Sequence, residues 1–132
     1  MVCLDTTFFA DLFRKDPAAE KKLYELANDT ETVSTTVMTI AELYYGAYKS
    51  KNISEEMKNV AAVLNSFLIL EMNQEGAKIF GEILSTLEKK GQIIPDRDIL
   101  IGAISLSKGE ETIVTRNAKD FAKIPGLKVQ TY

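Results

Sequence analysis

The chain has 132 residues, of which 45% are hydrophobic and 27% charged, and its formal net charge is -3. This length and composition predict a single folded domain over residues 1–132 and exclude a disordered chain or one that needs disulfides to fold. Without histidine and with one cysteine, the sequence excludes histidine-dependent catalytic triads and argues against a structural zinc site. It also lacks a signal-peptide pattern and an apolar run of membrane-spanning length, so we expect a cytoplasmic protein.

Short apolar runs alternate with stretches of helical periodicity along the chain. In chain order, the pattern predicts a strand at 2–4, helices at 7–14 and 17–27, a polar break at 28–30, a strand at 32–35, helices at 37–49 and 54–64, a strand at 67–70, helices at 74–90 and 97–108, and strands at 112–114 and 128–130. The last of these helices is apolar on nearly every side and should be buried. Asp16, just before Pro17, and Ser54 are the expected N-caps of the second and fourth helices. Alternating strands and helices predict an α/β fold with a central, mainly parallel sheet covered by helices on both faces.

Three small polar residues, Asp5, Thr6 and Thr7, abruptly end the first predicted strand. In an open parallel sheet, ligands bind just beyond the carboxyl ends of the strands, so Asp5 is a candidate site residue. The alternative is that Asp5 only caps the next helix. A late strand ends similarly, at residues 115–117, where Asn117 could instead adopt a left-handed turn conformation.

Further acids lie near the starts of two predicted helices. Glu42 could complete a capping box with Thr39, Asp96 could be an N-cap, and Asp98 could interact with the helix dipole. Residues two apart on a helix point to opposite sides, so Asp96 and Asp98 are not both expected to face one site. Spacing alone does not choose between them.

A joint interpretation is that these acids converge at one edge of the sheet. Carboxylate oxygens without histidine form the donor set that hard cations such as Mg²⁺ or Mn²⁺ prefer. Gathering like charges is unfavourable unless a cation neutralises them. Bound cations would also let an acidic protein hold phosphates, which its net charge otherwise disfavours. The spacing of these residues supports convergence on one site no more strongly than it supports their separate roles in helix caps, helix dipoles and turns.

Four segments carry a more specific signal: Leu-Asp-Thr at 4–6, Ile-Ala-Glu-Leu-Tyr-Tyr-Gly-Ala at 40–47, Asp-Ile-Leu-Ile-Gly-Ala at 98–103, and Val-Thr-Arg-Asn-Ala-Lys-Asp-Phe at 114–121. In this order, they make the chain resemble the PIN-domain ribonucleases, and more narrowly the VapC-type toxins of prokaryotic toxin–antitoxin pairs. The resemblance implies a PIN-like fold and a metal-dependent endoribonuclease that hydrolyses RNA phosphodiester bonds. It also implies three partners: an RNA substrate, a small VapB-like antitoxin and a second copy of the chain.

The same resemblance implies particular site residues. Asp5, Glu42 and Asp98 match acids that hold Mg²⁺ or Mn²⁺, and together with Asn117 they are the expected catalytic residues. The family pattern thus selects Asp98 over Asp96.

Four further residues are expected to support the site. Thr6 and Thr115 match hydroxyl residues that line the family's site, and Asp96 and Asp120 are further supporting acids. Asp120 is the alternative fourth site residue, because the amide of Asn117 supplies no negative charge.

RNA contacts are predicted from position alone. Arg97, Arg116 and Lys119 lie in segments close to the proposed site, where they could hold phosphates. Tyr44 and Tyr48, four apart on one predicted helix, could stack on a base, but packing against another helix is the favoured interpretation. The alternative function is a non-catalytic RNA- or protein-binding PIN-like domain.

Overall fold

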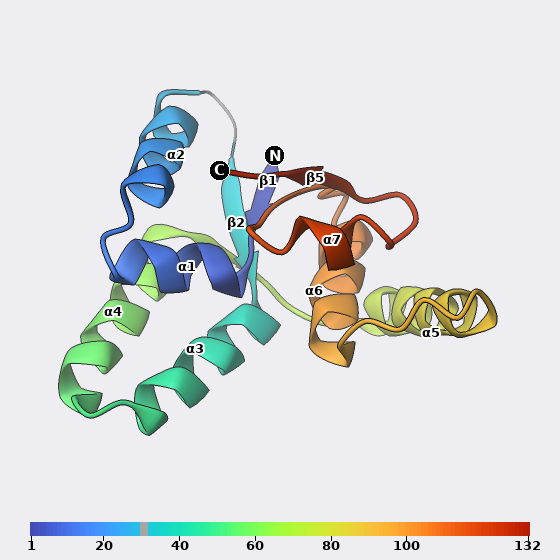
Figure 1. Ribbon diagram of the computed structural model, residues 1–132, viewed down its shortest axis with the longest axis horizontal. Coiled ribbons are helices and arrows are strands. Elements are labelled where there is room, and N and C mark those ends of the chain that lie inside the picture. The colour runs from blue at the N-terminus through green and yellow to red at the C-terminus, as the bar shows by residue number, and fades with distance from the viewer. Residues whose placement is uncertain (30–31) are drawn as a thin grey trace.

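A five-stranded parallel sheet forms the centre of the protein (Figure 1), whose computed structural model describes residues 1–29 and 32–132. The strands lie in the order β3-β2-β1-β4-β5, so the first strand of the chain is the middle one. They are β1 (Val2–Leu4), β2 (Val33–Thr36), β3 (Leu68–Leu70), β4 (Thr112–Val114) and β5 (Lys128–Gln130). The helices are α1 (Thr6–Phe13), α2 (Pro17–Asn28), α3 (Val37–Lys49), α4 (Ile53–Ser66), α5 (Gln74–Lys89), α6 (Asp96–Ser107) and α7 (Ala118–Phe121). The end of the polar break predicted at 28–30 lies outside the described residues.

Parallel pairing brings the ends of three strands to one edge of the sheet. Leu4 of β1 pairs with Thr35 of β2 on one side and with Val114 of β4 on the other. The residues that follow β1 and β4, Asp5 and Thr115, therefore lie next to each other although 110 positions separate them in the chain. This edge is where ligands bind in open α/β sheets.

Helices cover both faces of the sheet, α1 to α4 on one side and α5 to α7 on the other (Figure 1). The buried side chains form two clusters, one around Phe8 and Phe9 and one around Phe121. Val114 belongs to the first cluster and Ile113 to the second, because successive residues of a strand point to opposite faces. The predicted α/β fold with a parallel central sheet and helices on both faces is confirmed.

The N-cap residues predicted from the sequence agree only in part with those of the structure. Asp16 caps α2 as predicted, by accepting a hydrogen bond from the Ala19 N–H at 3.1 Å. The N-cap expected at Ser54 is wrong, because α4 begins at Ile53 and Asn52 caps it. The cap expected at Asp96 is also wrong, because Asp96 is already the first residue of α6 and its side chain makes no capping hydrogen bond.

The structural alternatives for Glu42 and Asn117 are wrong as well. Thr36 is the N-cap of α3, and its hydroxyl accepts a hydrogen bond from the Thr39 N–H at 3.1 Å. Thr39 and Glu42 therefore form no capping box, since both lie inside the helix. Asn117 has φ of -91°, outside the left-handed region, and it precedes the short helix α7, which the sequence did not predict.

The exposed face of α3 also differs from expectation. Tyr44 and Tyr48 are 36% and 67% exposed, so their predicted packing against another helix is wrong.

Within 1–29 and 32–132, no helix is long and apolar enough to cross a bilayer.

Candidate active site

Asp5 lies at the centre of the carboxyl edge of the sheet and is almost fully buried. Its Oδ1 accepts hydrogen bonds from the Phe8 N–H at 3.0 Å and the Thr7 hydroxyl at 2.8 Å. Its Oδ2 accepts a hydrogen bond from the Thr115 hydroxyl at 2.5 Å. The carboxylate thus caps α1, as one interpretation of the sequence held, and also joins α1 to the loop after β4.

Glu42 is the second acid of this edge and comes from α3. Its Oε1 accepts a hydrogen bond from the Thr6 hydroxyl at 2.7 Å, and its Oε2 lies 3.5 Å from Arg97 Nη1. Each of the two hydroxyl residues predicted to support the site therefore contacts one of the predicted ligands: Thr6 contacts Glu42, and Thr115 contacts Asp5.

Asp98 comes from the first turn of α6 and is linked to the loop after β4. Asn117 Nδ2 donates to Asp98 Oδ2 and to Asp120 Oδ2, both at 3.1 Å. Both candidates for a fourth site residue, Asn117 and Asp120, thus lie beside Asp98. Asp96 is exposed, and no hydrogen bond or ion pair within the described part of the chain joins it to this group.

The carboxylates influence one another's ionisation. Burial, together with the nearby charges of Glu42, Asp120 and Asp5, raises the pKa of Asp98 from 3.8 to about 6. Burial also raises the pKa of Asp5, against the effect of its hydrogen bonds, and the charge of Glu42 adds to the rise. Acids from three separate elements therefore share one electrostatic environment, which a bound cation would stabilise.

The donor chemistry of this group fits a hard divalent cation, since it consists of carboxylate, hydroxyl and amide oxygens. In the structure itself, no three acidic or cysteine side chains of the described residues are arranged closely enough to form a ready-made cation site. Glu42 is engaged by Thr6 and Arg97, and Asp98 by Asn117. The match between this group and a divalent cation therefore rests on the type of its donor atoms and on the repulsion between its carboxylates.

The raised pKa of Asp98 leads to a prediction for the metal-free protein. Its folded-state pKa of about 6 exceeds the ordinary 3.8, so the folded state loses stability as pH rises through this window and regains it as pH falls below it. Asp98→Asn removes the penalty while keeping an oxygen that can accept from Asn117. In chelator at pH 7.5, we expect its melting temperature to exceed that of the native protein by about 4 °C, or about 1 kcal/mol after allowance for solvent screening.

At pH 4 the two melting temperatures should nearly coincide, because Asp98 is then largely protonated. Melting curves followed by circular dichroism at both pH values measure the difference. An equal difference at both would show that repulsion among the acids does not destabilise the metal-free protein.

The three basic residues predicted to contact RNA lie in different surroundings. Arg97 pairs with Glu42, Lys119 is exposed on α7, and the Arg116 guanidinium is held by Asp11 and Asp16. Sequence reasoning missed the roles of Asp11, Asp16 and Tyr132 beside the site. No spacing signal pointed to them, because Tyr132 meets Asp11 across 121 positions of the chain.

An α/β protein with oxygen-donor side chains at the carboxyl edge of a parallel sheet belongs to the class suited to binding a hard cation and an anionic ligand there. Comparison with protein families identifies one family within this class, because the PIN domain model matches residues 2–127. The chain belongs to the PIN-domain family, in its VapC-type branch, and the assignment from sequence to PIN-domain ribonucleases of the VapC type is confirmed.

Three similar proteins illustrate the branch. Ribonuclease VapC2 of Rickettsia felis is 30% identical over 129 residues, which cover 98% of this chain and 96% of that protein. The tRNA(fMet)-specific endonuclease VapC of Salmonella typhimurium is 26% identical over the same shares of both chains. The crystal structure of VapBC2 from Rickettsia felis, bound to a DNA fragment from the promoter, contains a chain that superposes with a TM-score of 0.90 at 28% identity. The match covers 100% of this chain and 99% of that one.

Proposed function

We propose that residues 1–132 form a single PIN-like unit that acts in the cytoplasm as a metal-dependent endoribonuclease, the toxin of a type II toxin–antitoxin pair. The observation that carries the proposal is the gathering of Asp5, Glu42 and Asp98 at one sheet edge, where burial, with the charges of the neighbouring acids, raises the pKa values of Asp5 and Asp98. The names of the relatives, ribonuclease and endonuclease, support hydrolysis of RNA.

In this proposal Asp5, Glu42 and Asp98 hold Mg²⁺ or Mn²⁺, which when bound would activate a water and neutralise charge on the phosphate. Thr115 fixes the orientation of the Asp5 carboxylate, and Thr6 does the same for Glu42. These contacts limit side-chain motion at two of the three ligands. No histidine base is needed for this chemistry.

Asn117 has a distinct role in the proposal. Its amide donates to both Asp98 and Asp120, so it holds two carboxylates without adding a negative charge. Asp98 and Asp120 can thereby stay close together, and Asp120 supports the site through Asn117. Arg97 and Lys119 are the proposed contacts for RNA phosphates, because both are exposed beside the acids.

The test is direct incubation of the purified protein with total cellular RNA and Mn²⁺ or Mg²⁺, followed by mapping of new 5′ ends. We expect cleavage at a small set of positions, and none when chelator replaces the cation. An absence of new ends at every cation concentration would instead favour a non-catalytic RNA- or protein-binding role.

The antitoxin partner is proposed to bind beside Glu42. A hollow of about 380 Å³ lies there between α1, α3 and α4, and Phe13, Leu43 and Gly46 contribute to its lining. An apolar helix in this hollow could place a basic side chain next to the acids. The similar chain from Rickettsia felis was crystallised as VapBC2, which supports a VapB-like partner.

Gly46 allows this surface to be tested without disturbing the fold. A Cβ at Gly46 would meet no atom within 4 Å, and Gly46 lines the hollow, so we expect the side chain of Gly46→Leu to be accommodated in the free protein and to project into the hollow. We expect the variant to be more stable by about 0.5–1 kcal/mol, because glycine is unfavourable inside a helix. We also expect it to lose co-purification with the product of an adjacent small reading frame.

Gly81 of α5 provides the matched control, since a Cβ there also meets nothing within 4 Å. Gly81→Leu should gain similar stability and keep the partner. Retention of the partner by both variants would place the antitoxin elsewhere.

A homodimer is also proposed, through an apolar surface on the other side of α3. Val37, Ala41, Met72 and Leu100 contribute to a hollow of about 270 Å³, and Val37 and Met72 are 40% and 37% exposed. Exposed apolar surface of this kind is typical of protein–protein contacts. Light scattering of the purified protein should give twice the chain mass of 14.7 kDa, and a monomer at all concentrations would contradict the proposal.

A further inference from the structure

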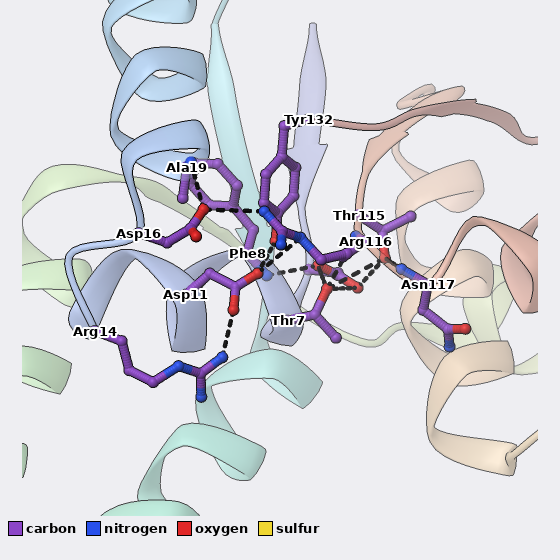
Figure 2. Close-up of polar contacts among 11 residues, drawn as sticks. Thr7, Phe8, Asp11, Arg14, Asp16, Ala19, Thr115, Arg116, Asn117 and Tyr132 are labelled. Atoms are coloured by element: carbon purple, nitrogen blue, oxygen red, sulfur yellow. Dashed lines mark hydrogen bonds and ion pairs between the residues drawn. The ribbon is translucent and has the colours of Figure 1, made fainter.

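Arg116 follows β4, and two acids and an aromatic ring hold its guanidinium. Its Nε lies 3.1 Å from Asp11 Oδ2, its Nη2 donates to Asp16 Oδ2 at 2.9 Å, and its guanidinium carbon lies 4.6 Å from the centre of the Tyr132 ring. Figure 2 shows these side chains converging from separate parts of the chain. We call Arg116, Asp11, Asp16 and Tyr132 the Arg116 clamp.

Asp11 is the central acid of the clamp and is only 7% exposed. The Tyr132 hydroxyl donates to its Oδ2 at 2.7 Å, and Arg14 pairs with its Oδ1. Although burial opposes ionisation, the hydroxyl and the guanidiniums of Arg14 and Arg116 hold the pKa of Asp11 below its usual value. Arg116 therefore has a counter-ion that stays charged at neutral pH.

The backbone around Arg116 reaches the candidate active site directly. The Arg116 N–H donates to Thr7 Oγ1 at 3.2 Å, and the Thr7 hydroxyl donates to Asp5. On either side, Thr115 donates its hydroxyl to Asp5 and the Asn117 N–H donates to Thr115 Oγ1 at 2.8 Å. The side chain of Arg116 thus points toward Asp11, Asp16 and Tyr132 (Figure 2). Its neighbours Thr115 and Asn117 instead donate hydrogen bonds to Asp5 and Asp98.

We propose that Arg116 is a positioning residue, which ties the loop after β4 to α1, to the start of α2 and to Tyr132, and so keeps Thr115 and Asn117 against the acids. This inference rests on the proposed function, because the acids matter only if the site is catalytic. The positive charge of Arg116 is satisfied by Asp11 and Asp16. Arg116 therefore acts on the rate of cleavage through the loop and not by contact with RNA phosphates.

Arg14 provides a matched control within the same cluster. It pairs with Asp11 as Arg116 does, but its side chain is 70% exposed and it belongs to the end of α1 rather than to the loop. Both arginines line a hollow of about 370 Å³ that also borders Asn117. Loss of either one removes a charge from that hollow, but only loss of Arg116 should loosen the loop.

Hydrogen exchange tests the positioning without RNA or cation. In Arg116→Gln, we expect peptides that contain residues 115–117 to exchange about tenfold faster, and in Arg14→Gln we expect no change there. Tyr132→Phe removes the hydroxyl that donates to Asp11 but keeps the ring beside Arg116, and it should produce a smaller increase. This second variant keeps the proposal testable if Arg116→Gln does not fold. Unchanged exchange in every folded clamp variant would overturn the proposal.

Kinetics separate positioning from RNA contact. Arg116→Gln should lower kcat by about 10–100-fold with KM for RNA unchanged, whereas Arg14→Gln should leave kcat near native. A raised KM with native kcat would overturn the proposal and assign Arg116 to phosphate binding. If the native protein cleaves no RNA, the proposed function fails, while hydrogen exchange still decides whether the clamp holds the loop.

Discussion

Replacing Asp5 by asparagine should lower the rate of RNA cleavage about a thousandfold, since loss of a ligand that stabilises developing charge corresponds to several kcal/mol. The structure makes asparagine the informative substitution. Asparagine caps helices as well as aspartate does, and its Oδ1 can still accept from the Phe8 N–H. Because burial already disfavours the charge of Asp5, we expect the Asp5→Asn melting temperature to be equal to or above that of the native protein. Cleavage assays and melting curves on one preparation measure both.

Asp5→Ala would be harder to interpret. Alanine removes the cap of α1, which costs about 1 kcal/mol, and leaves the Thr7 and Thr115 hydroxyls without their acceptor. The matched control is Asp96→Asn, which removes an exposed carboxylate near the same edge and should cleave at about the native rate. Native-rate cleavage by Asp5→Asn would end the proposed role of Asp5.

Glu42→Gln should lower cleavage by about a hundredfold or more, because a carboxamide holds a hard cation far more weakly than a carboxylate. Glu42 has no capping role that would confuse the result, since Thr36 is the N-cap of α3. The glutamine Oε1 can still accept from the Thr6 hydroxyl, so local geometry should persist. Single-turnover cleavage rates at saturating Mn²⁺ measure the effect.

Glu56→Gln is the control for this substitution, because Glu56 lines the same hollow as Glu42 but comes from α4. It should leave the cleavage rate unchanged within about twofold, since it alters only a partly exposed charge. If both glutamine variants slowed cleavage equally, the loss would reflect the charge of the hollow rather than a ligand at Glu42.

Periodicity predicted most of the fold because each strand and long helix carries its own hydrophobic pattern. The strand expected at 32–35 lies at Val33–Thr36, and the buried helix expected at 97–108 lies at Asp96–Ser107. Helix α7 was missed because four residues are too few for a periodic pattern. The wrong caps at Ser54 and Asp96 have a similar cause, since a helix start that is shifted by one or two residues moves the capping position to a different residue.

The acids of the site were predicted only in part from physical pattern. Asp5 was a candidate because it ends a strand, but the preference for Asp98 over Asp96 came from family resemblance. The structure gives a physical reason for it: Asp98 shares burial and charge with the other acids, whereas Asp96 is exposed. The Arg116 clamp was not predicted, because its members lie at residues 11, 16, 116 and 132 and meet only through the tertiary fold.

Calorimetric titration of the chelator-treated protein with Mn²⁺ tests most directly whether Asp5, Glu42 and Asp98 form a cation site. We expect saturable binding by the native protein and by Asp96→Asn, and affinities at least about tenfold weaker in Asp5→Asn and Glu42→Gln. No measurable binding by the native protein, or equal binding by all four proteins, would contradict the account and favour a PIN-like domain without a competent metal site.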